Sequence, residues 1–367
     1  MRFKITLVLV GLMLVTGCGG SPTADQGSEG GSGGTGYEDV FDAIDGLSGE
    51  ERTKKLVSLA EEEGGELSLY TSMTSDVEDA VAEAFGDAYD IDVSVYRSAS
   101  ETVLQRLVQE ADADFHGSDI VETNGPELFS LSSEEVLVPY ESEFTQDLVE
   151  GSTYDDWVAD RFNKFVISYN TDKVSEGDRP ASWEDLADPQ WDGQLAMELE
   201  DIDWYKTLWE YWVEEDGKSE EEAAQLFADI AQGAIFVKGH TVMGDLLAAG
   251  EYSVAASNYS YLVQNIVDKG APVAWEPPAE PVISRPNGVG LVEGAPHPAT
   301  AVLFMDWILS EGQELFLDFN LDPARADIAT APQANEIFVD LESLNEEMDE
   351  WSTRYEELVD LGEVAED

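Results

Sequence analysis

The stretch LSLYTSMTSDVEDAVAEAFGDAYDIDVSVYRSASETVLQRLVQEADADFHGSDIV, residues 67–121, decides the fold that we expect for this chain. Short apolar runs at Leu67–Tyr70, 91–95 and Asp119–Val121 alternate with two longer segments whose apolar residues recur at helical spacing. Ser100 precedes the second of these segments and is expected to cap it. The order strand, helix, strand, helix, strand predicts an open α/β sheet with right-handed crossovers.

A second series of the same kind follows later in the chain. Its expected strands are Phe165–Tyr169, Leu195–Met197, Ala234–Val237 and Ser253–Ala256, and helices are expected between them. The two series predict two α/β lobes of similar size. In open α/β sheets ligands bind beyond the carboxyl ends of the strands, so we expect the lobes to face each other across a ligand cleft.

The charge of the chain excludes one class of partner and suggests an environment. Acidic residues number 79 and basic residues 18, so the net charge is 18 − 79 = −61. Nucleic-acid binding is excluded, because a phosphate backbone requires Lys and Arg. Hydrophobic residues make up 43%, enough for a sizeable core. Repulsion among the carboxylates is severe at low ionic strength. At ~1 M salt the Debye length falls to roughly 3 Å, so neighbouring carboxylates no longer repel one another. We therefore expect a halophilic protein; the alternative is an ordinary acidic one.

The first residues have the pattern of an export signal. Arg2 and Lys4 precede an apolar run at 5–15, which is too short to span a bilayer. Cys18 follows and is the one cysteine of the chain, so no internal disulfide is possible. We expect a signal peptide at 1–17, lipidation of Cys18, and a flexible Gly/Ser tether at 18–37. The protein is then exported and anchored by lipid to the outer face of the cell membrane; the alternative for Cys18 is a buried free thiol.

Motifs for catalysis are missing from the sequence. It has no glycine-rich phosphate loop, dinucleotide fingerprint or nucleophile elbow. Its three histidines, His116, His240 and His297, are far apart and lack the spacing of metal motifs. We therefore expect no enzyme and no catalytic cofactor. A lipid-anchored extracellular enzyme and an acidic adhesion protein stay as alternatives of other classes.

Several stretches together carry a family resemblance. They are LSLYTS at 67–72, FVISYNT at 165–171, SWEDL at 182–186, DPQWDG at 188–193, GAPV at 270–273 and GAPHP at 294–298. They resemble the extracellular solute-binding proteins of ABC transporters, in the branch usually labelled ferric-iron binding, over nearly all of the chain after residue 60. The resemblance implies a periplasmic-binding-protein-like fold with hinge strands between the lobes. Lobe 1 would comprise 55–160 and 286–335, and lobe 2 would comprise 161–285 and 336–367.

The resemblance also implies a function. The protein would capture a solute by cleft closure and deliver it to an ABC permease, with ferric iron or a ferric chelate favoured as the transported ligand. A small organic solute or an oxyanion is the alternative within transport. We expect a monomer that meets the membrane only through its lipid anchor.

Candidate ligand-binding residues lie at the ends of expected strands and the starts of expected helices. Hydroxyls and amides there can hold an oxyanion or a carboxylate, Thr241 is expected to cap its helix, and an aromatic face at Trp204 beside Asp203 suits an organic cation. The candidates are Thr71, Ser72, Ser100, Asn124, Asp203, Trp204, His240, Thr241, Asn258, Tyr259 and Tyr261.

The candidate metal ligands are Tyr259, Tyr261 and Tyr205, because phenolate oxygen suits a hard cation such as Fe(III). The tyrosine pair of the family's iron binders falls at Tyr259 and Ser260, so one tyrosine of the pair is kept. This sequence has Thr74 at the position of the family's histidine ligand and Asn124 near the position of its glutamate ligand, so both ligands are missing. The family's anion-binding segment corresponds to residues near 203–204. These departures keep both the metal and the organic ligand open.

Overall fold

The computed structural model describes residues 36–330 and 335–365 of the chain. The predicted signal peptide at 1–17, the lipidated Cys18 and nearly all of the predicted tether lie outside these residues. Tyr37, which the sequence placed at the end of the tether, is buried and opens helix α1 (Tyr37–Ile44). Within the described ranges no helix has the length and apolar character needed to cross a membrane.

The first half of the sheet consists of three parallel strands in the order β3-β1-β2. These strands are β1 (Glu66–Thr71), β2 (Asp92–Arg97) and β3 (Ile120–Asn124), and each is followed by a helix, α3 (Ser75–Tyr89), α4 (Ser100–Asp112) and α5 (Gly125–Ser133). Val77, Val81 and Phe85 are buried on α3 at the four-residue spacing of one helix face. The alternation predicted from residues 67–121 is confirmed.

The second half repeats this plan with strands in the order β7-β6-β8, in which β6 runs parallel to both neighbours. The strands are β6 (Leu195–Glu198), β7 (Ala234–Val237) and β8 (Val254–Tyr259). The helices are α6 (Ile202–Glu210), which continues as a π-helical turn over Tyr211–Glu215, α7 (Glu220–Gln232), α8 (His240–Ala249) and α9 (Ser260–Asp268). The mixed α/β fold expected from the sequence is therefore confirmed.

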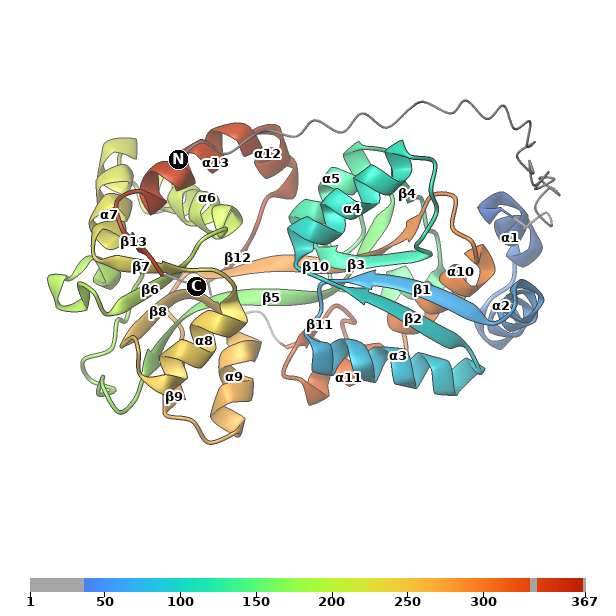
Figure 1. Cartoon of the computed structure of the whole chain (residues 1–367), viewed down its shortest axis with the longest axis horizontal. Coiled ribbons are helices and arrows are strands. Elements are labelled where there is room, and N and C mark those ends of the chain that lie inside the picture. Colours follow the sequence, from blue (N-terminus) through green and yellow to red (C-terminus); the bar gives the residue numbers. More distant parts are fainter. Residues whose placement is uncertain (1–35, 331–334, 366–367) are drawn as a thin grey trace, which may run out of the picture. The chain divides into compact units, whose positions relative to one another are not determined.

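Two long strands join the halves, as Figure 1 shows. They are β5 (Trp157–Asn170) and β10 (Val282–Val292), which pair antiparallel and are buried along their whole length. β5 also pairs with β8 of the second half, and β10 pairs with β3 of the first. Residues 163 and 285 are direct partners across β5 and β10, and so are residues 161 and 287. The side chains of these pairs therefore meet where the halves join.

The remaining helices cover the sheet and include a pair that contacts both halves. α2 (Gly49–Glu63), α10 (Pro298–Ile308) and α11 (Gln313–Asp318) belong to the first half, and Arg52 pairs with Asp306 at 2.6 Å between α2 and α10. At the end of the chain α12 (Leu341–Glu346) packs against α5, whereas α13 (Met348–Val359) packs against α6 and α7. The last helices thus touch the first half as well as the second.

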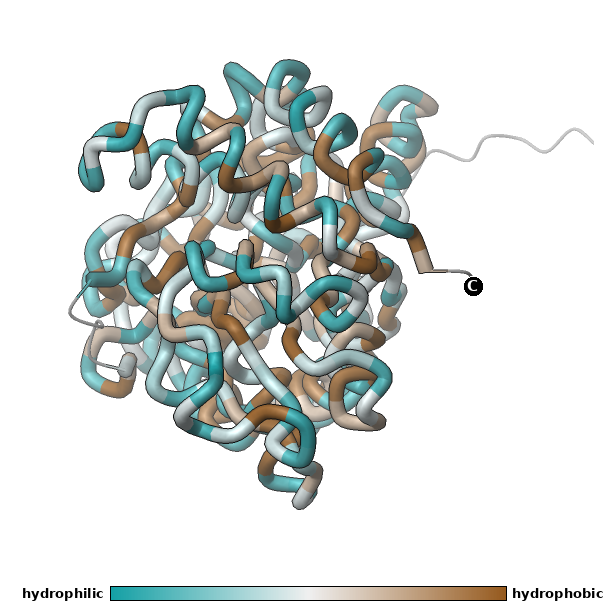
Figure 2. The backbone as a smooth tube through the Cα atoms, turned by 90° about the vertical axis from the view of Figure 1, so that its left-hand side faces the viewer, coloured by the Kyte–Doolittle hydropathy of each residue, from teal (hydrophilic) through white to brown (hydrophobic). Residues whose placement is uncertain are grey.

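Short strands complete the sheet at β4 (Leu137–Val138), β9 (Val273–Ala274), β11 (Asp322–Pro323), β12 (Glu336–Phe338) and β13 (Glu363–Val364). Short 3-10 turns occupy Glu143–Asp147, Glu184–Ala187 and Pro189–Trp191. Hydrophilic and apolar stretches alternate along the backbone (Figure 2), as expected for elements that bury one face and expose the other.

Two helix starts differ by one residue from the sequence expectation. α4 begins at Ser100 itself, with Ala99 at the cap position. α8 begins at His240, so Thr241 lies inside the helix and is not its cap. The cap position of α8 belongs to Gly239, whose φ of 91° is a conformation that glycine adopts without steric cost. This turn brings the chain into the helix before Thr241 is reached.

Candidate functional site

A cavity of about 1060 Å³ lies at the carboxyl ends of the parallel strands of both halves. Its wall takes residues from the ends of β1, β2 and β3, from the ends of β6, β7 and β8, from β5 and β10, and from α13. This is the position in which open α/β sheets bind ligands, because helix starts and loop backbones converge there.

Most of the sequence-predicted site residues line this cavity. Those that do are Ser72, Ser100, Asn124, Asp203, His240, Thr241, Tyr259 and Tyr261. They come from strand ends and helix starts in both halves, separated by up to 189 positions in the sequence (Ser72 to Tyr261, 261 − 72 = 189). The structure thus brings together residues that the sequence could only propose one by one.

Four other candidates are buried and lie outside the cavity wall. Trp204 packs against the rings of Trp183 and Phe227, and Tyr205 lies in an aromatic cluster with Trp351 and Tyr355. Thr71 donates its hydroxyl hydrogen bond to Glu122, and Asn258 accepts one from the backbone N–H of Tyr259. Tyr205 and Tyr259 are therefore not brought together as neighbouring metal ligands.

Arg285, which the sequence analysis missed, is the centre of the polar contacts. Its Nη1 pairs with Asp203 at 3.0 Å, and its Nη2 donates to the Tyr259 hydroxyl at 2.6 Å and to Asn124 Oδ1 at 3.1 Å. The guanidinium also lies over the rings of Phe165 and Tyr259. It is 5% exposed, so these partners compensate a charge that is largely withdrawn from water. Through them Arg285 contacts both halves of the protein.

Tyr259 and His240 form a stacked aromatic pair in the cavity wall. Their ring centroids are 3.8 Å apart and the planes differ by 17°. Nε2 of His240 lies 3.0 Å from a carboxylate oxygen of Asp201. Burial opposes the charge of the imidazole, but the neighbouring carboxylates of Asp201 and Glu198 together outweigh it and raise the pKa of His240 above its usual value. Burial raises the pKa of Tyr259 well above its usual value, although Arg285 acts in the opposite direction.

Buried carboxyls surround these groups. Burial, reinforced by Asp201, raises the pKa of Glu198 to about 7. Burial likewise raises the pKa of Asp203, against the opposing effect of Arg285. The side chain of Glu198 accepts hydrogen bonds from the backbone N–H groups of Gly239, at 2.8 Å, and of Glu200. The carboxyl groups of Glu198 and Asp203 therefore stay protonated to a higher pH than free carboxyl groups do.

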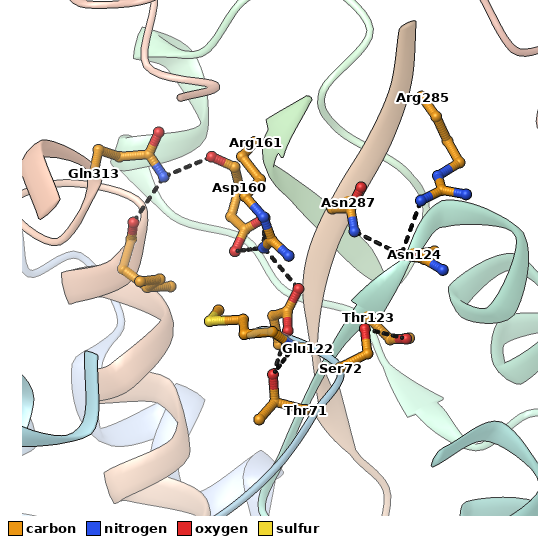
Figure 3. A network of polar contacts seen from close by, with 12 residues as sticks. Thr71, Ser72, Glu122, Thr123, Asn124, Asp160, Arg161, Arg285, Asn287 and Gln313 are labelled. Atoms are coloured by element: carbon orange, nitrogen blue, oxygen red, sulfur yellow. Dashed lines mark hydrogen bonds and ion pairs between the residues drawn. The ribbon is translucent and has the colours of Figure 1, made fainter. Parts of the chain in front are cut away.

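A second buried network lies beside the first, at the junction of β1, β3 and β5 (Figure 3). Nη1 of Arg161 lies 2.6 Å from Glu122 and 3.0 Å from Asp160. Gln313 donates to the backbone oxygen of Asp160 at 2.9 Å. The pKa of Asp160 is raised to about 7, mainly by burial. The positive charge of Arg161 opposes this rise, and the negative charge of Glu122 adds to it. One guanidinium thus compensates two carboxyls, and of this network Arg161 reaches the cavity wall.

The capacity of the site for a metal ion rests on its tyrosines. In the described part of the chain no group of three or more His, Cys, Asp or Glu side chains is placed to hold a metal. The rings of Tyr259 and Tyr261 are 6.1 Å apart and nearly parallel. Burial raises the pKa of Tyr261 to about 12, and Arg285 already occupies the hydroxyl of Tyr259. A metal bound here would have to displace Arg285 and two phenol protons.

Comparisons with known proteins agree with this geometry. The family described as bacterial extracellular solute-binding protein matches residues 123–338. Among curated relatives, iron uptake protein A1 of Synechocystis sp. is 23% identical over 334 residues, which cover 85% of this chain and 81% of the relative.

Solved structures share the fold at low sequence identity. Iron-bound HitA from Pseudomonas aeruginosa matches with a TM-score of 0.66 and 20% identity, over 80% of this chain and 99% of that one. The periplasmic binding protein AfuA from Actinobacillus pleuropneumoniae, with fructose-6-phosphate bound, matches with a TM-score of 0.69 and 19% identity, over 82% of this chain and 100% of that one. These likenesses establish the two-lobed periplasmic-binding-protein fold and leave the ligand to the residues of the site.

Proposed function

Because the chain belongs to the bacterial extracellular solute-binding proteins, we propose that it is the solute receptor of an ABC importer. It captures a solute by cleft closure and delivers it to a permease in the membrane. The moving lobes are 55–160 with 286–335 and 161–285 with 336–367, joined by β5 and β10. A ligand that contacts both lobes only in the closed state stabilises closure by that difference in affinity.

One observation carries this proposal: Arg285, on a strand that joins the halves, is hydrogen-bonded to Asn124 at the end of β3 and to Asp203 and Tyr259 of the second half. A solute that enters the cavity and changes the contacts of Arg285 changes how the two halves are held together. Such a link between ligand contact and lobe position is what a receptor of this kind requires.

Ferric iron, free or chelated, is the cargo that we favour from the names of relatives. Iron uptake protein A1 is named for iron, and the HitA structure is iron-bound. A ferric chelate accords better with this cavity than a bare ion does. The Tyr259 hydroxyl already accepts from Arg285, and a volume of about 1060 Å³ far exceeds one ion.

A small organic solute or an oxyanion is the second candidate. Arg285 and Arg161 line the cavity, and guanidinium groups bind carboxylates and phosphates in defined geometries. The AfuA structure, which has the same fold, holds fructose-6-phosphate. In this role the protein carries out no reaction of its own, in keeping with a family of binding proteins.

The location that we propose follows from the sequence and the family description together. The protein is exported, Cys18 carries the lipid, and the stretch between Cys18 and the start of α1 tethers the folded part to the outer face of the cell membrane. It acts as a monomer with the permease as its partner.

A titration with ferric citrate in concentrated potassium chloride tests the proposal on the full chain. Small-angle scattering measures the radius of gyration while visible absorbance and Trp fluorescence follow binding. We expect a saturable decrease in radius that coincides with the fluorescence change. A tyrosinate-to-iron absorbance band would favour direct iron ligation by Tyr259. Binding without any decrease in radius would contradict closure as the mechanism.

A further inference from the structure

Helix α12 lies between the two halves, beside the cavity (Figure 1). It packs against α5 of the first half, and the chain continues from it into α13, which packs against α6 and α7 of the second half. Leu344 of α12 lines the cavity, and so do Pro126 and Ser130 of α5. The contact between α12 and α5 therefore joins the halves along the wall of the cavity, in addition to the two joining strands.

On the side of the second half, α12 is held by a buried polar contact. Lys206 of α6 donates to the hydroxyl of Ser343 at 2.8 Å, and its Nζ lies 3.6 Å from the carboxylate of Glu347, directly after α12. Lys206 is 2% exposed and also lies near the ring of Trp351 on α13. Separating α12 from α6 would disturb the partners of a buried charge, which is costly.

On the side of the first half, the contact is apolar. Leu341 and Leu344 are buried in the same cluster as Leu128 and Leu131 of α5, and no hydrogen bond of the described residues joins α12 to α5. A Cβ atom on Gly125, in the first turn of α5, would lie 2.9 Å from Cδ1 of Leu341, so this approach requires a glycine. Such a contact can open and reform without leaving a buried polar atom unpaired.

A second contact between the halves is of a different kind. Asn320, which follows α11, donates to the side chains of Asn265 at 2.8 Å and of Asp268 at 2.9 Å, both on α9. These groups are exposed, so water replaces the hydrogen bonds when the contact opens and little free energy is lost. Burial of two leucines at α12 therefore contributes more to the difference between a closed and an open arrangement of the halves.

We infer that α12 is a latch for the cleft: it moves with the second half, and Leu341 and Leu344 leave α5 when the halves separate. The latch adds apolar burial to the closed state whether or not a solute is bound. It therefore raises the closed fraction of the ligand-free protein, and the apparent affinity rises in proportion to that fraction. This inference rests on the proposed function, because it concerns the closure by which the receptor captures its solute.

Distances between spin labels, measured by double electron–electron resonance in concentrated potassium chloride, test which half α12 follows. Cys18 is the one cysteine of the chain, so a Cys18→Ser background allows specific labelling. Label sites are the exposed Ser133→Cys on α5, Glu346→Cys on α12 and Glu215→Cys after α6, taken in pairs. On addition of ferric citrate we expect the distance from 133 to 346 to shorten while the distance from 346 to 215 stays constant. The reverse pattern overturns the latch, because α12 would then follow the first half.

Leu341→Ala tests the energetic part, since Leu341 lies outside the cavity wall. We expect the ratio of closed to open molecules without ligand, measured from the distance between 133 and 215, to fall about tenfold, and the affinity for ferric citrate to fall by a similar factor. Leu59→Ala, in the core of the first half, is the matched control and should change neither. Asn320→Ala should lower the ratio by no more than about twofold. If Leu341→Ala does not fold, the label distances in the chain with Leu341 intact still decide the question.

Failure of the latch and failure of the proposed function give different results. A distance between 133 and 215 that is the same in every state, with and without ferric citrate and with Leu341→Ala, would show that the halves do not move, and closure fails together with the latch. If that distance varies but Leu341→Ala leaves the ratio unchanged, closure stands and the latch is wrong. If ferric citrate does not bind, the ligand-free ratios before and after Leu341→Ala still make this comparison.

Discussion

The hydroxyl of Tyr259 accepts a hydrogen bond of 2.6 Å from Arg285, so a residue at the end of β8 is held by a side chain of β10. The same guanidinium pairs with Asp203 at the start of α6. Strand β10 is thereby fastened to two elements of the second half, on the wall of the cavity. The ligand site and the connection between the halves share these residues, so changes at either affect both.

Tyr259→Phe removes this hydrogen bond and leaves the ring in place. We expect the free energy of unfolding to fall by about 1–2 kcal/mol, because a buried hydrogen bond to a charged group is lost. We also expect ligand binding to weaken about tenfold, since Arg285 becomes free to move. Urea unfolding and a ferric citrate titration measure the two effects. Tyr252→Phe, in a separate part of the core, is the control; unchanged affinity in Tyr259→Phe would remove Tyr259 from the site.

Arg285→Met leaves the buried carboxylate of Asp203 without its ion-pair partner. We expect a loss of roughly 3–5 kcal/mol in the free energy of unfolding, the usual cost of an uncompensated buried charge. Adding Asp203→Asn should restore a large part of it, because the pair interacts directly at 3.0 Å. Urea unfolding of the four proteins of this cycle gives the coupling energy. Strictly additive losses would show that the two side chains do not depend on each other.

Apolar periodicity predicted the strand ends well, but it did not reveal the site residues that lie on the joining strands β5 and β10. Apolar periodicity located the strands that precede Asn124, His240 and Tyr259, and polar residues after such strands point to one edge of a sheet. Arg285 and Asn287 could not be found in this way. Their role depends on pairing between β10 and a strand more than a hundred residues earlier, which no local pattern encodes.

Trp204 illustrates a second limit. It follows Asp203 directly, and the sequence suggested that both face the ligand. Successive residues of a helix point about 100° apart, so at the start of α6 Asp203 faces the cavity while Trp204 is turned into the core beside Trp183. The one signal for Arg285 in the sequence was its charge, two positions after the end of the apolar pair Val282 and Ile283.

Stability should decrease as the pH rises through neutrality. The pKa values of Glu198 and Asp160 are both about 7 in the folded protein, above the ordinary values of carboxyls. A raised folded-state pKa gives stability that is complete below the unfolded-state pKa and lost as the pH rises through the folded-state value. The raised pKa of His240 acts with the same sign.

Urea unfolding from about pH 5 to 8 at constant concentrated salt should therefore show a steady fall in the free energy of unfolding. Glu198→Gln should flatten part of this slope, because its share no longer titrates. Glu342→Gln, an exposed change on α12, should leave the slope as it is. A slope that rises with pH, or one that Glu198→Gln leaves unaltered, would contradict this assignment.

Removal of salt should unfold the protein through general repulsion among its carboxylates and not through the loss of one particular contact. The chain has 79 acidic and 18 basic residues, so ion pairs can neutralise only a minority of the carboxylates and the net charge is −61. The Debye length is roughly 3 Å at ~1 M salt and roughly 30 Å at ~0.01 M salt. In dilute salt the carboxylates therefore repel one another across the whole surface. We expect the helical circular dichroism signal to be lost on dialysis and regained when potassium chloride is restored.

The buried pair of Arg52 and Asp306 is shielded from solvent ions, so Asp306→Asn should shift the midpoint of the salt-dependent transition upward and leave the steepness of that transition unchanged. Full helical signal in dilute buffer would refute adaptation to concentrated salt.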